Sequence, residues 1–153
     1  MTNAAIVYND ASFKWSRSAA SNAYQAPEAF LCLLSLAATA DRGMATLESE
    51  WLQQLTRRWS ERGVVREHDV QALNFAVCDR LAKGLEAALA EASAALPPIC
   101  RIPVFAQALD LMLANGPLRP QEEEFAQELA VALSIEEAEA RRMRECLSLK
   151  NAY

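Results

Sequence analysis

Residues 28–40 read EAFLCLLSLAATA, and this stretch decides the fold. It is apolar on every side of a helix, which indicates a helix that other elements surround completely. Pro27 stands directly before it, and proline favours the first turn of a helix because its fixed φ suits that position. We therefore expect a central helix that begins at Pro27, with other helices packed around it.

The rest of the chain supplies those surrounding helices. Ala and Leu dominate a hydrophobic content of 52%, while Gly and β-branched residues are scarce, so the composition favours helices over a sheet. The expected fold class is all-α. Helical spacing of apolar residues, interrupted by Pro and Gly, predicts further helices over residues 47–60, 67–81, 85–96 and 103–114, from near 120, and from 135 or 136 to about 150.

A chain of 153 residues is long enough for one domain with a real core, and a second domain is not expected. Residues 1–25 mix Asn, Ser and Ala with Phe13, Trp15 and Tyr24, and they keep neither the period of a strand nor that of a helix. We interpret them as an N-terminal arm that is partly disordered or lies across the domain. Residues 26–153 then form the helical domain.

The chain contains a weak internal repeat. Shifting it by 74 residues aligns residues 29–55 with residues 103–129 without a gap. Each segment resembles a helical hairpin whose apolar face cannot be buried alone, so we expect a bundle of two pseudo-symmetric hairpin halves. Chance similarity between two amphipathic hairpins is the alternative. The paired positions include Asp41 with Asn115 and Glu48 with Glu122.

Charge and segment lengths exclude several classes of protein. With 15 basic and 20 acidic side chains the net charge is -5, so nucleic acid is not an expected partner. The start MTNAAIVYND lacks the basic and apolar regions of a signal peptide, and the apolar run 29–40 is too short to span a bilayer. We expect no transmembrane segment and a cytoplasmic location.

Each half carries an acidic or amide residue at the end of one helix and a Glu in the first turn of the next. These pairs are Asp41 with Glu48 and Asn115 with Glu122, and Asp110 lies five residues before Asn115. Oxygen ligands from both sides of a turn suit a hard divalent cation such as Ca²⁺ or Mg²⁺. We therefore take these five residues as the candidate metal site, with Mn²⁺ and Zn²⁺ as further options for the cofactor.

The same residues also have explanations without a metal. Glu48 and Glu122 stabilise helix N-termini through the helix dipole, and Asn115 before Gly116 is a common way to end a helix. Asp110 lies on a polar stripe that would face water. Asp41 faces the negative end of a helix dipole, so it needs compensation from Arg42, a hydrogen bond or a cation.

No catalytic motif accompanies these loops. His68 is the one histidine and stands in the polar run REHD, where a surface position is favoured over a base or ligand. No phosphate-binding glycine loop occurs. The cysteines are far apart, which favours reduced and mostly buried thiols over redox or zinc chemistry; they are Cys32, Cys78, Cys100 and Cys146.

Residues 122–139 carry seven acidic side chains and no basic one, and Arg141, Arg142 and Arg144 follow. Such separation of acidic from basic residues is typical of helix faces that lie in water and form ion pairs between neighbouring turns. A docking surface for a basic partner is the less favoured alternative.

Taken in order, three segments carry a resemblance to a known family. They are AYQAPEAFLCLLSLAATADRGM, then ALPPICRIPVFAQALDLMLANGPLRPQEEEFAQELAVALSI, and the ending CLSLKN. Over about Ala23 to Asn151 the chain resembles the TerB-like tellurite-resistance family, in particular its short stand-alone members.

The resemblance implies a compact bundle of about seven to eight helices with pseudo-twofold halves. It also implies a role in bacterial responses to tellurite and other chemical stress, no enzymatic activity, and an acidic cluster proposed to hold a metal ion. Carried over by position, that cluster falls on Asp41, Glu48, Asp110, Asn115 and Glu122.

The family usually has Asp-Gly in both loops, whereas this chain has Asp41-Arg42 and Asn115-Gly116. The loss of one carboxylate and the added positive charge of Arg42 both weaken a site for a hard cation.

The function expected is that of a non-catalytic module in a stress-response system, which acts on other proteins of that system and binds a divalent metal through the acidic cluster. A metal-dependent enzyme that uses the same cluster is the alternative, and so is a structural interaction domain without a ligand. The partner proteins are not identified by the sequence, and a homodimer stays open.

Overall fold

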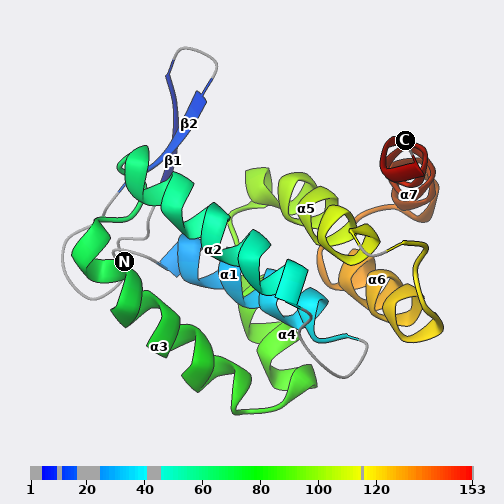
Figure 1. Ribbon diagram of the computed structural model, residues 1–153, viewed down its shortest axis with the longest axis horizontal. Coiled ribbons are helices and arrows are strands. Elements are labelled where there is room, and N and C mark those ends of the chain that lie inside the picture. The colour runs from blue at the N-terminus through cyan, green and yellow to red at the C-terminus, as the bar shows by residue number, and fades with distance from the viewer. Residues whose placement is uncertain (1–4, 10–11, 17–24, 41–45, 115, 153) are drawn as a thin grey trace.

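Helices make up almost all of the described chain (Figure 1). The computed structural model describes residues 5–9, 12–16, 25–40, 46–114 and 116–152. Its α-helices are α1 (Gln25–Ala38), α2 (Thr46–Glu61), α3 (Val70–Leu81), α4 (Leu85–Ala95), α5 (Arg101–Leu113), α6 (Pro120–Ala132) and α7 (Glu137–Ala152). Two 3₁₀ helices, η2 (Glu67–Asp69) and η3 (Pro98–Cys100), precede α3 and α5. The expected all-α class is confirmed.

The helices begin and end close to the Pro and Gly residues that the sequence predicts as their limits. Pro120 is the first residue of α6, and α4 ends at Ala95, two residues before Pro97. Gly63 after α2 and Gly84 after α3 have φ values of 71° and 102°, which glycine adopts far more readily than other residues.

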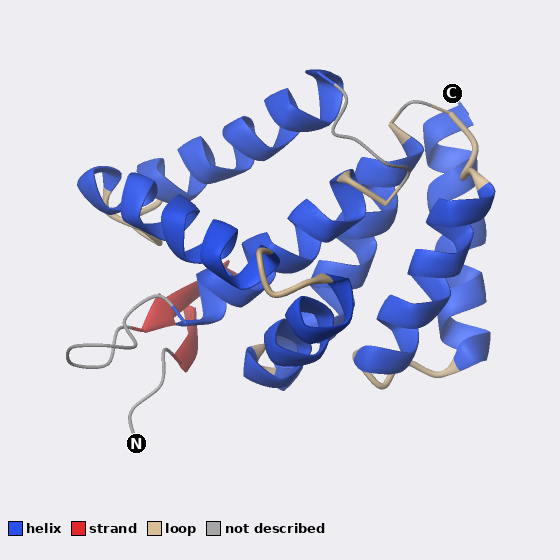
Figure 2. Ribbon diagram, turned by 90° about the horizontal axis from the view of Figure 1, so that it is seen from below, coloured by secondary structure: helices blue, strands red, loops and turns tan. Residues whose placement is uncertain are grey.

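α1 is the core helix of the bundle, as its apolar sequence predicts. Its residues from Ala26 to Ala38 are buried except for Glu28, and it packs against α3, α4 and α5 (Figures 1 and 2). The ring of Phe30 meets that of Trp59 from α2 edge to face, with 5.5 Å between centroids. α1 therefore links α2 and the later helices into one core.

The N-terminal arm contains a β-hairpin that the sequence did not predict. Strands β1 (Ala5–Asn9) and β2 (Ser12–Ser16) pair antiparallel, with Ile6 opposite Trp15 and Tyr8 opposite Phe13. Ser12–Ser16 alternates polar and apolar residues, but Ala5–Asn9 does not, so the segment as a whole shows no sustained period of two. The content of β-branched and aromatic residues in the two strands was the signal that could have found them.

The helix bounds agree with the 74-residue offset of the repeat. α2 begins at Thr46 and α6 at Pro120, which are 74 positions apart, and α1 and α5 precede them in the same order. A twofold relation between the two hairpins stays a prediction.

Within the described ranges, no single helix is both long and apolar enough to cross a membrane. The bent pair Leu85–Ala95 and Pro98–Leu113 meets that criterion by length and composition alone, across a bend of 116°.

Candidate functional site

A cleft of about 560 Å³ lies between α6 and the ends of α1, α3 and α4. Leu36 from α1, Leu81 from α3 and Phe125 from α6 contribute apolar side chains to it, and Leu85 adds the first residue of α4. Leu36 and Phe125 are buried parts of the core, whereas Leu85 is 50% exposed. The cleft thus opens an apolar part of the bundle to solvent.

Two carboxylates of α6, Glu124 and Glu128, also line this cleft, which we call the acidic cleft. They are exposed and stand one helical turn apart. Within the described residues neither has an ion-pair or hydrogen-bond partner. Like charges at this spacing destabilise a helix by about 0.2–0.5 kcal/mol, so a cation supplied from outside would relieve a local repulsion.

The residues that line the acidic cleft include those just before the first predicted acidic loop and one just after the second. Thr39 and Ala40, which line it, directly precede Asp41, and Gln121 lies in the first turn of α6, after the second loop. The described residues that flank the two loops are therefore brought to one place. Asp41 and Asn115 themselves lie outside the described residues, and so does the side chain of Glu48 on α2.

Asp110 is partly exposed, as its place on a polar stripe predicts, and two side chains of α7 bind it. Its Oδ1 accepts hydrogen bonds from Lys150 Nζ at 2.6 Å and Asn151 Nδ2 at 2.9 Å. Burial raises the pKa of Asp110, but the hydrogen bonds and charge from α7 outweigh it and hold that pKa below its ordinary value of 3.8. The carboxylate joins α5 to the end of α7.

Glu122 serves as a helix cap, in keeping with the explanation that needs no metal. Its carboxylate is 4% exposed, and its Oε1 accepts the backbone N–H of Arg119 at 2.9 Å, at the start of α6. This contact satisfies one of the N–H groups left free at a helix N-terminus and places a negative charge at the positive end of the dipole.

The described part of the proposed donor set does not fit a divalent cation. Asp110 and Glu122 both hold protein donors, and a cation at Asp110 would have to displace the ammonium group of Lys150. In the part of the chain that the structure describes, no three His, Cys, Asp or Glu side chains are grouped to hold a metal. A metal that uses Asp41, Glu48 and Asn115 stays a prediction.

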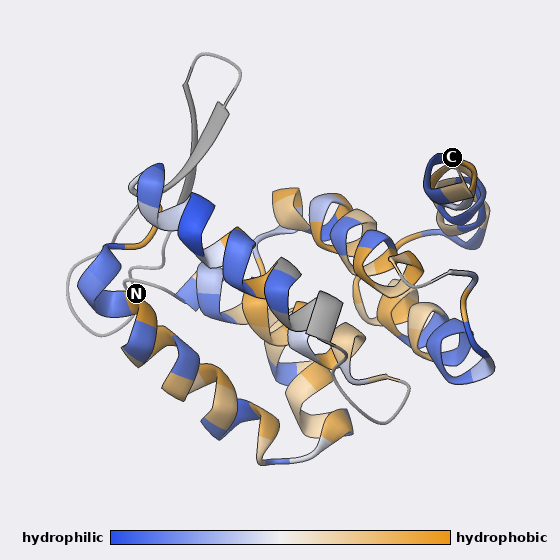
Figure 3. Cartoon of the chain, viewed as in Figure 1, coloured by the Kyte–Doolittle hydropathy of each residue, from blue (hydrophilic) through white to orange (hydrophobic). Residues whose placement is uncertain are grey.

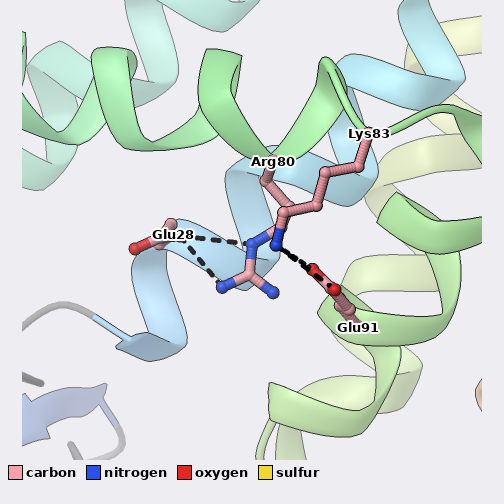
Figure 4. A network of polar contacts seen from close by, with 4 residues as sticks. All are labelled: Glu28, Arg80, Lys83 and Glu91. Carbon is pink, nitrogen blue, oxygen red and sulfur yellow. Dashed lines mark hydrogen bonds and ion pairs between the residues drawn. The ribbon is translucent and has the colours of Figure 1, made fainter.

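An interhelix ion pair positions one wall of the acidic cleft. Arg80 of α3 donates from Nε and Nη2 to Oε1 of Glu28 on α1, at 3.2 and 2.9 Å (Figure 4). Just beyond α3, Lys83 binds Glu91 of α4 at 3.1 Å. These pairs fix the end of α3, and hence Leu81, against α1 and α4.

The remaining candidates have no chemical role in this arrangement. His68 is exposed, as expected, with its Nε2 3.6 Å from Asp69. The thiols are free, but the expectation that they are mostly buried is wrong: Cys32 and Cys100 are buried, and Cys78 and Cys146 are exposed. Cys78 and Cys146 are exposed because they lie on the outer faces of α3 and α7.

A second and larger cleft of about 790 Å³ lies between α7 and the connection from α5 to α6. Its charged side chains include both signs, and Arg144 Nη2 lies 3.6 Å from Glu123 Oε1 across it. Charges that compensate each other leave little attraction for an ion from outside. The acidic cleft is therefore the stronger candidate.

The chain gives no significant match to any known protein family, to any curated protein or to any solved structure.

Proposed function

We propose that this chain is a non-catalytic helical module of a bacterial tellurite and chemical-stress response system, located in the cytoplasm. It acts by binding a basic amphipathic segment of another protein in the acidic cleft. The observation that carries this proposal is the pair Glu124 and Glu128, which stand without a described partner beside an apolar surface.

The chemistry of the acidic cleft defines the partner segment. Leu36, Leu81 and Phe125 offer an apolar surface, so the segment presents apolar side chains to them. Lys or Arg side chains one helical turn apart match the spacing of Glu124 and Glu128. An apolar centre with a charged rim is the usual composition of a protein interface.

The place of the acidic cleft beside both acidic loops supports the same function. Ala40, which directly precedes Asp41 in the chain, and Gln121, which directly precedes Glu122, both line this cleft, and Asp41 and Glu122 belong to the acidic cluster that the family resemblance implies. A partner seated there would contact described residues that flank the two loops in the sequence, Thr39, Ala40 and Gln121. Binding through Glu124 and Glu128 needs no metal ion.

A direct binding measurement tests the interaction. A fluorescent amphipathic peptide of leucine and lysine is titrated with the full chain, and the same peptide with glutamate in place of lysine is the control ligand. We expect Glu124→Gln/Glu128→Gln to weaken binding of the lysine peptide by about tenfold, since two rim charges are worth about 0.5–1 kcal/mol each.

The matched control variant is Glu136→Gln/Glu139→Gln, which removes two exposed carboxylates at and before the start of α7. It should bind the lysine peptide like the wild type. Equal weakening by both double variants would mean that net charge, and not the acidic cleft, attracts the peptide, and would refute the proposal.

Membership of a stress-response system needs a test in cells. The gene is deleted in the source organism, and growth is measured over a range of tellurite and peroxide concentrations. We expect the wild-type chain to restore growth and the Glu124→Gln/Glu128→Gln variant to fail at equal protein level. Unchanged growth of the deletion strain under every stress would remove the stress-response part of the proposal.

A further inference from the structure

The outer face of α3 carries an exposed aromatic side chain that no described helix covers. α3 lies at an edge of the bundle, packed on α1 and α4 (Figure 1), and much of it is hydrophobic (Figure 3). Its buried side chains Leu73 and Val77 face inward. Phe75, which lies midway along α3, is 62% exposed.

Four residues form an outward stripe: His68, Ala72, Phe75 and Asp79. Their separations of four, three and four positions place them on one side of a helix, starting from η2. All four are exposed. Full burial of a Phe side chain is favourable by about 1.5–3 kcal/mol, so contact with another surface would stabilise the exposed ring of Phe75.

The stripe is complementary to itself when two copies run antiparallel. A twofold axis midway between Ala72 and Phe75 places the ring of Phe75 against Ala72 of the second copy, where the small side chain leaves room for it. The same axis places His68 opposite Asp79 of the second copy. Both contacts occur twice, because the symmetry repeats each of them.

The charges on this stripe are available for such a contact. Among described residues Asp79 has no hydrogen-bond or ion-pair partner. His68 contacts Asp69 at 3.6 Å only, with its side chain 72% exposed. An imidazole can donate a hydrogen bond to a carboxylate, so the outer ends of the stripe attract each other in the antiparallel arrangement.

We propose that a second copy of this chain docks antiparallel on the outer face of α3, centred on Phe75 and Ala72. A helix of 12 residues is only about 18 Å long, so the contact area is below the roughly 800 Å² per partner of a standard interface. The dimer is therefore weak and forms at high micromolar concentration. This inference uses a different surface from the acidic cleft and does not depend on its function.

Sedimentation velocity of the full chain, from micromolar to millimolar concentration, tests the proposal. We expect a concentration-dependent dimer for the wild type and self-association at least about tenfold weaker for Phe75→Ser. Val131→Ser is the matched control, since Val131 is a large apolar residue on α6 that is 79% exposed. This control should dimerise like the wild type.

A charge-reversal mixture tests the antiparallel register. In its own dimer His68→Glu sets a carboxylate opposite Asp79, and Asp79→Lys removes the acceptor of the His68 imidazole, so each variant alone should associate more weakly than the wild type. Mixed in equal amounts, the two variants should associate more strongly than either alone, because one facing pair then joins a carboxylate to an ammonium group and the other keeps His68 opposite Asp79. A monomeric wild type at millimolar concentration, a dimer that Phe75→Ser leaves intact, or a mixture no stronger than its components would each overturn the proposal.

Discussion

Lys150 Nζ lies 2.6 Å from Asp110 Oδ1 and ties the last turns of α7 to the last turn of α5. α7 also packs on α5 through buried Ala140 and partly buried Met143 and Leu147, and its Arg144 lies 3.6 Å from Glu123 of α6. The polar surface of this helix is visible in Figure 3. Asp110 therefore adds a polar contact that holds the end of the C-terminal helix to α5.

Removing this contact should loosen α7. Lys150→Met is expected to lower the free energy of unfolding by up to about 1 kcal/mol, a modest value because Lys150 is 59% exposed and screened by water. Urea denaturation measures the loss, and amide hydrogen exchange should rise selectively in the last two turns of α7. Arg141→Met is the control, because its partner Glu137 is 90% exposed.

Asp110 also predicts how stability changes with pH. Its pKa in the folded chain is below the ordinary value of 3.8, so below that value the unfolded chain binds more protons. The stability that ionised Asp110 contributes is fully present above pH 3.8. It is lost as the pH falls through the pKa of Asp110 in the folded chain. Urea midpoints measured across this acid range should converge for the wild type and Asp110→Asn. A constant difference down to the lowest pH would contradict the ionic contact.

Asp110 should contribute little to any stabilisation of the wild type by divalent cations. A ligand at 100 times its dissociation constant adds about 2.7 kcal/mol to stability, so thermal melting with Ca²⁺, Mg²⁺, Mn²⁺ and Zn²⁺ detects binding sensitively. The ammonium group of Lys150 already neutralises Asp110, so Lys150→Met should bind these cations more tightly than the wild type if Asp110 is a ligand. A large shift in the wild type that survives Asp110→Asn would place the metal on Asp41, Glu48 or Asn115 instead.

The contact between Glu28 and Arg80 should contribute more to stability than the surface pairs. Their side chains are only 23% and 18% exposed, and one carboxylate oxygen accepts two guanidinium hydrogens. Arg80→Met or Glu28→Gln should each cost about 1–3 kcal/mol, because a half-buried charge loses its partner. A double-mutant cycle of Glu28 and Arg80, followed by urea denaturation, should give an interaction free energy well above the experimental error. The control Arg62→Met, at an exposed site, should lower the free energy of unfolding by less than about 0.5 kcal/mol.

The four thiols should react in two classes. Burial raises the pKa of Cys32 to about 11 and that of Cys100 to about 12, so neither forms the reactive thiolate at neutral pH. Cys78 and Cys146 are exposed and should be labelled quickly in the native protein. A thiol-reactive dye followed by mass spectrometry should label Cys32 and Cys100 only in denaturant. Rapid labelling of Cys100 in the native protein would contradict its position in the core.

Much of the helical framework could be predicted because its signals are local. The apolar run around Leu33 identifies α1, Pro120 marks the start of α6, and Gly63 and Gly84 mark where chain direction changes. Each of these acts within a few residues along the chain. The hairpin β1–β2 was not predicted because Ala5–Asn9 does not alternate polar and apolar residues, so only one of its two strands carries the pattern of a strand.

The candidate site was less predictable because its contacts join distant segments. Lys150 follows Asp110 by 40 residues, and Arg80 follows Glu28 by 52, so only the packed helices reveal these pairs. Glu124 and Glu128 were interpreted as a solvated face. Their significance comes from Leu36, Leu81 and Leu85, which three other helices bring beside them.

The central position of α1 also has a consequence for synthesis on the ribosome. Its apolar surface is complete at Ala38, yet α5, one of the helices that cover it, ends about 75 residues later at Leu113. At roughly 5–20 residues per second, that surface waits for several seconds or more without its final cover. Nascent chains that stop before α5 should therefore aggregate or engage chaperones, while those that extend beyond Leu113 should become soluble.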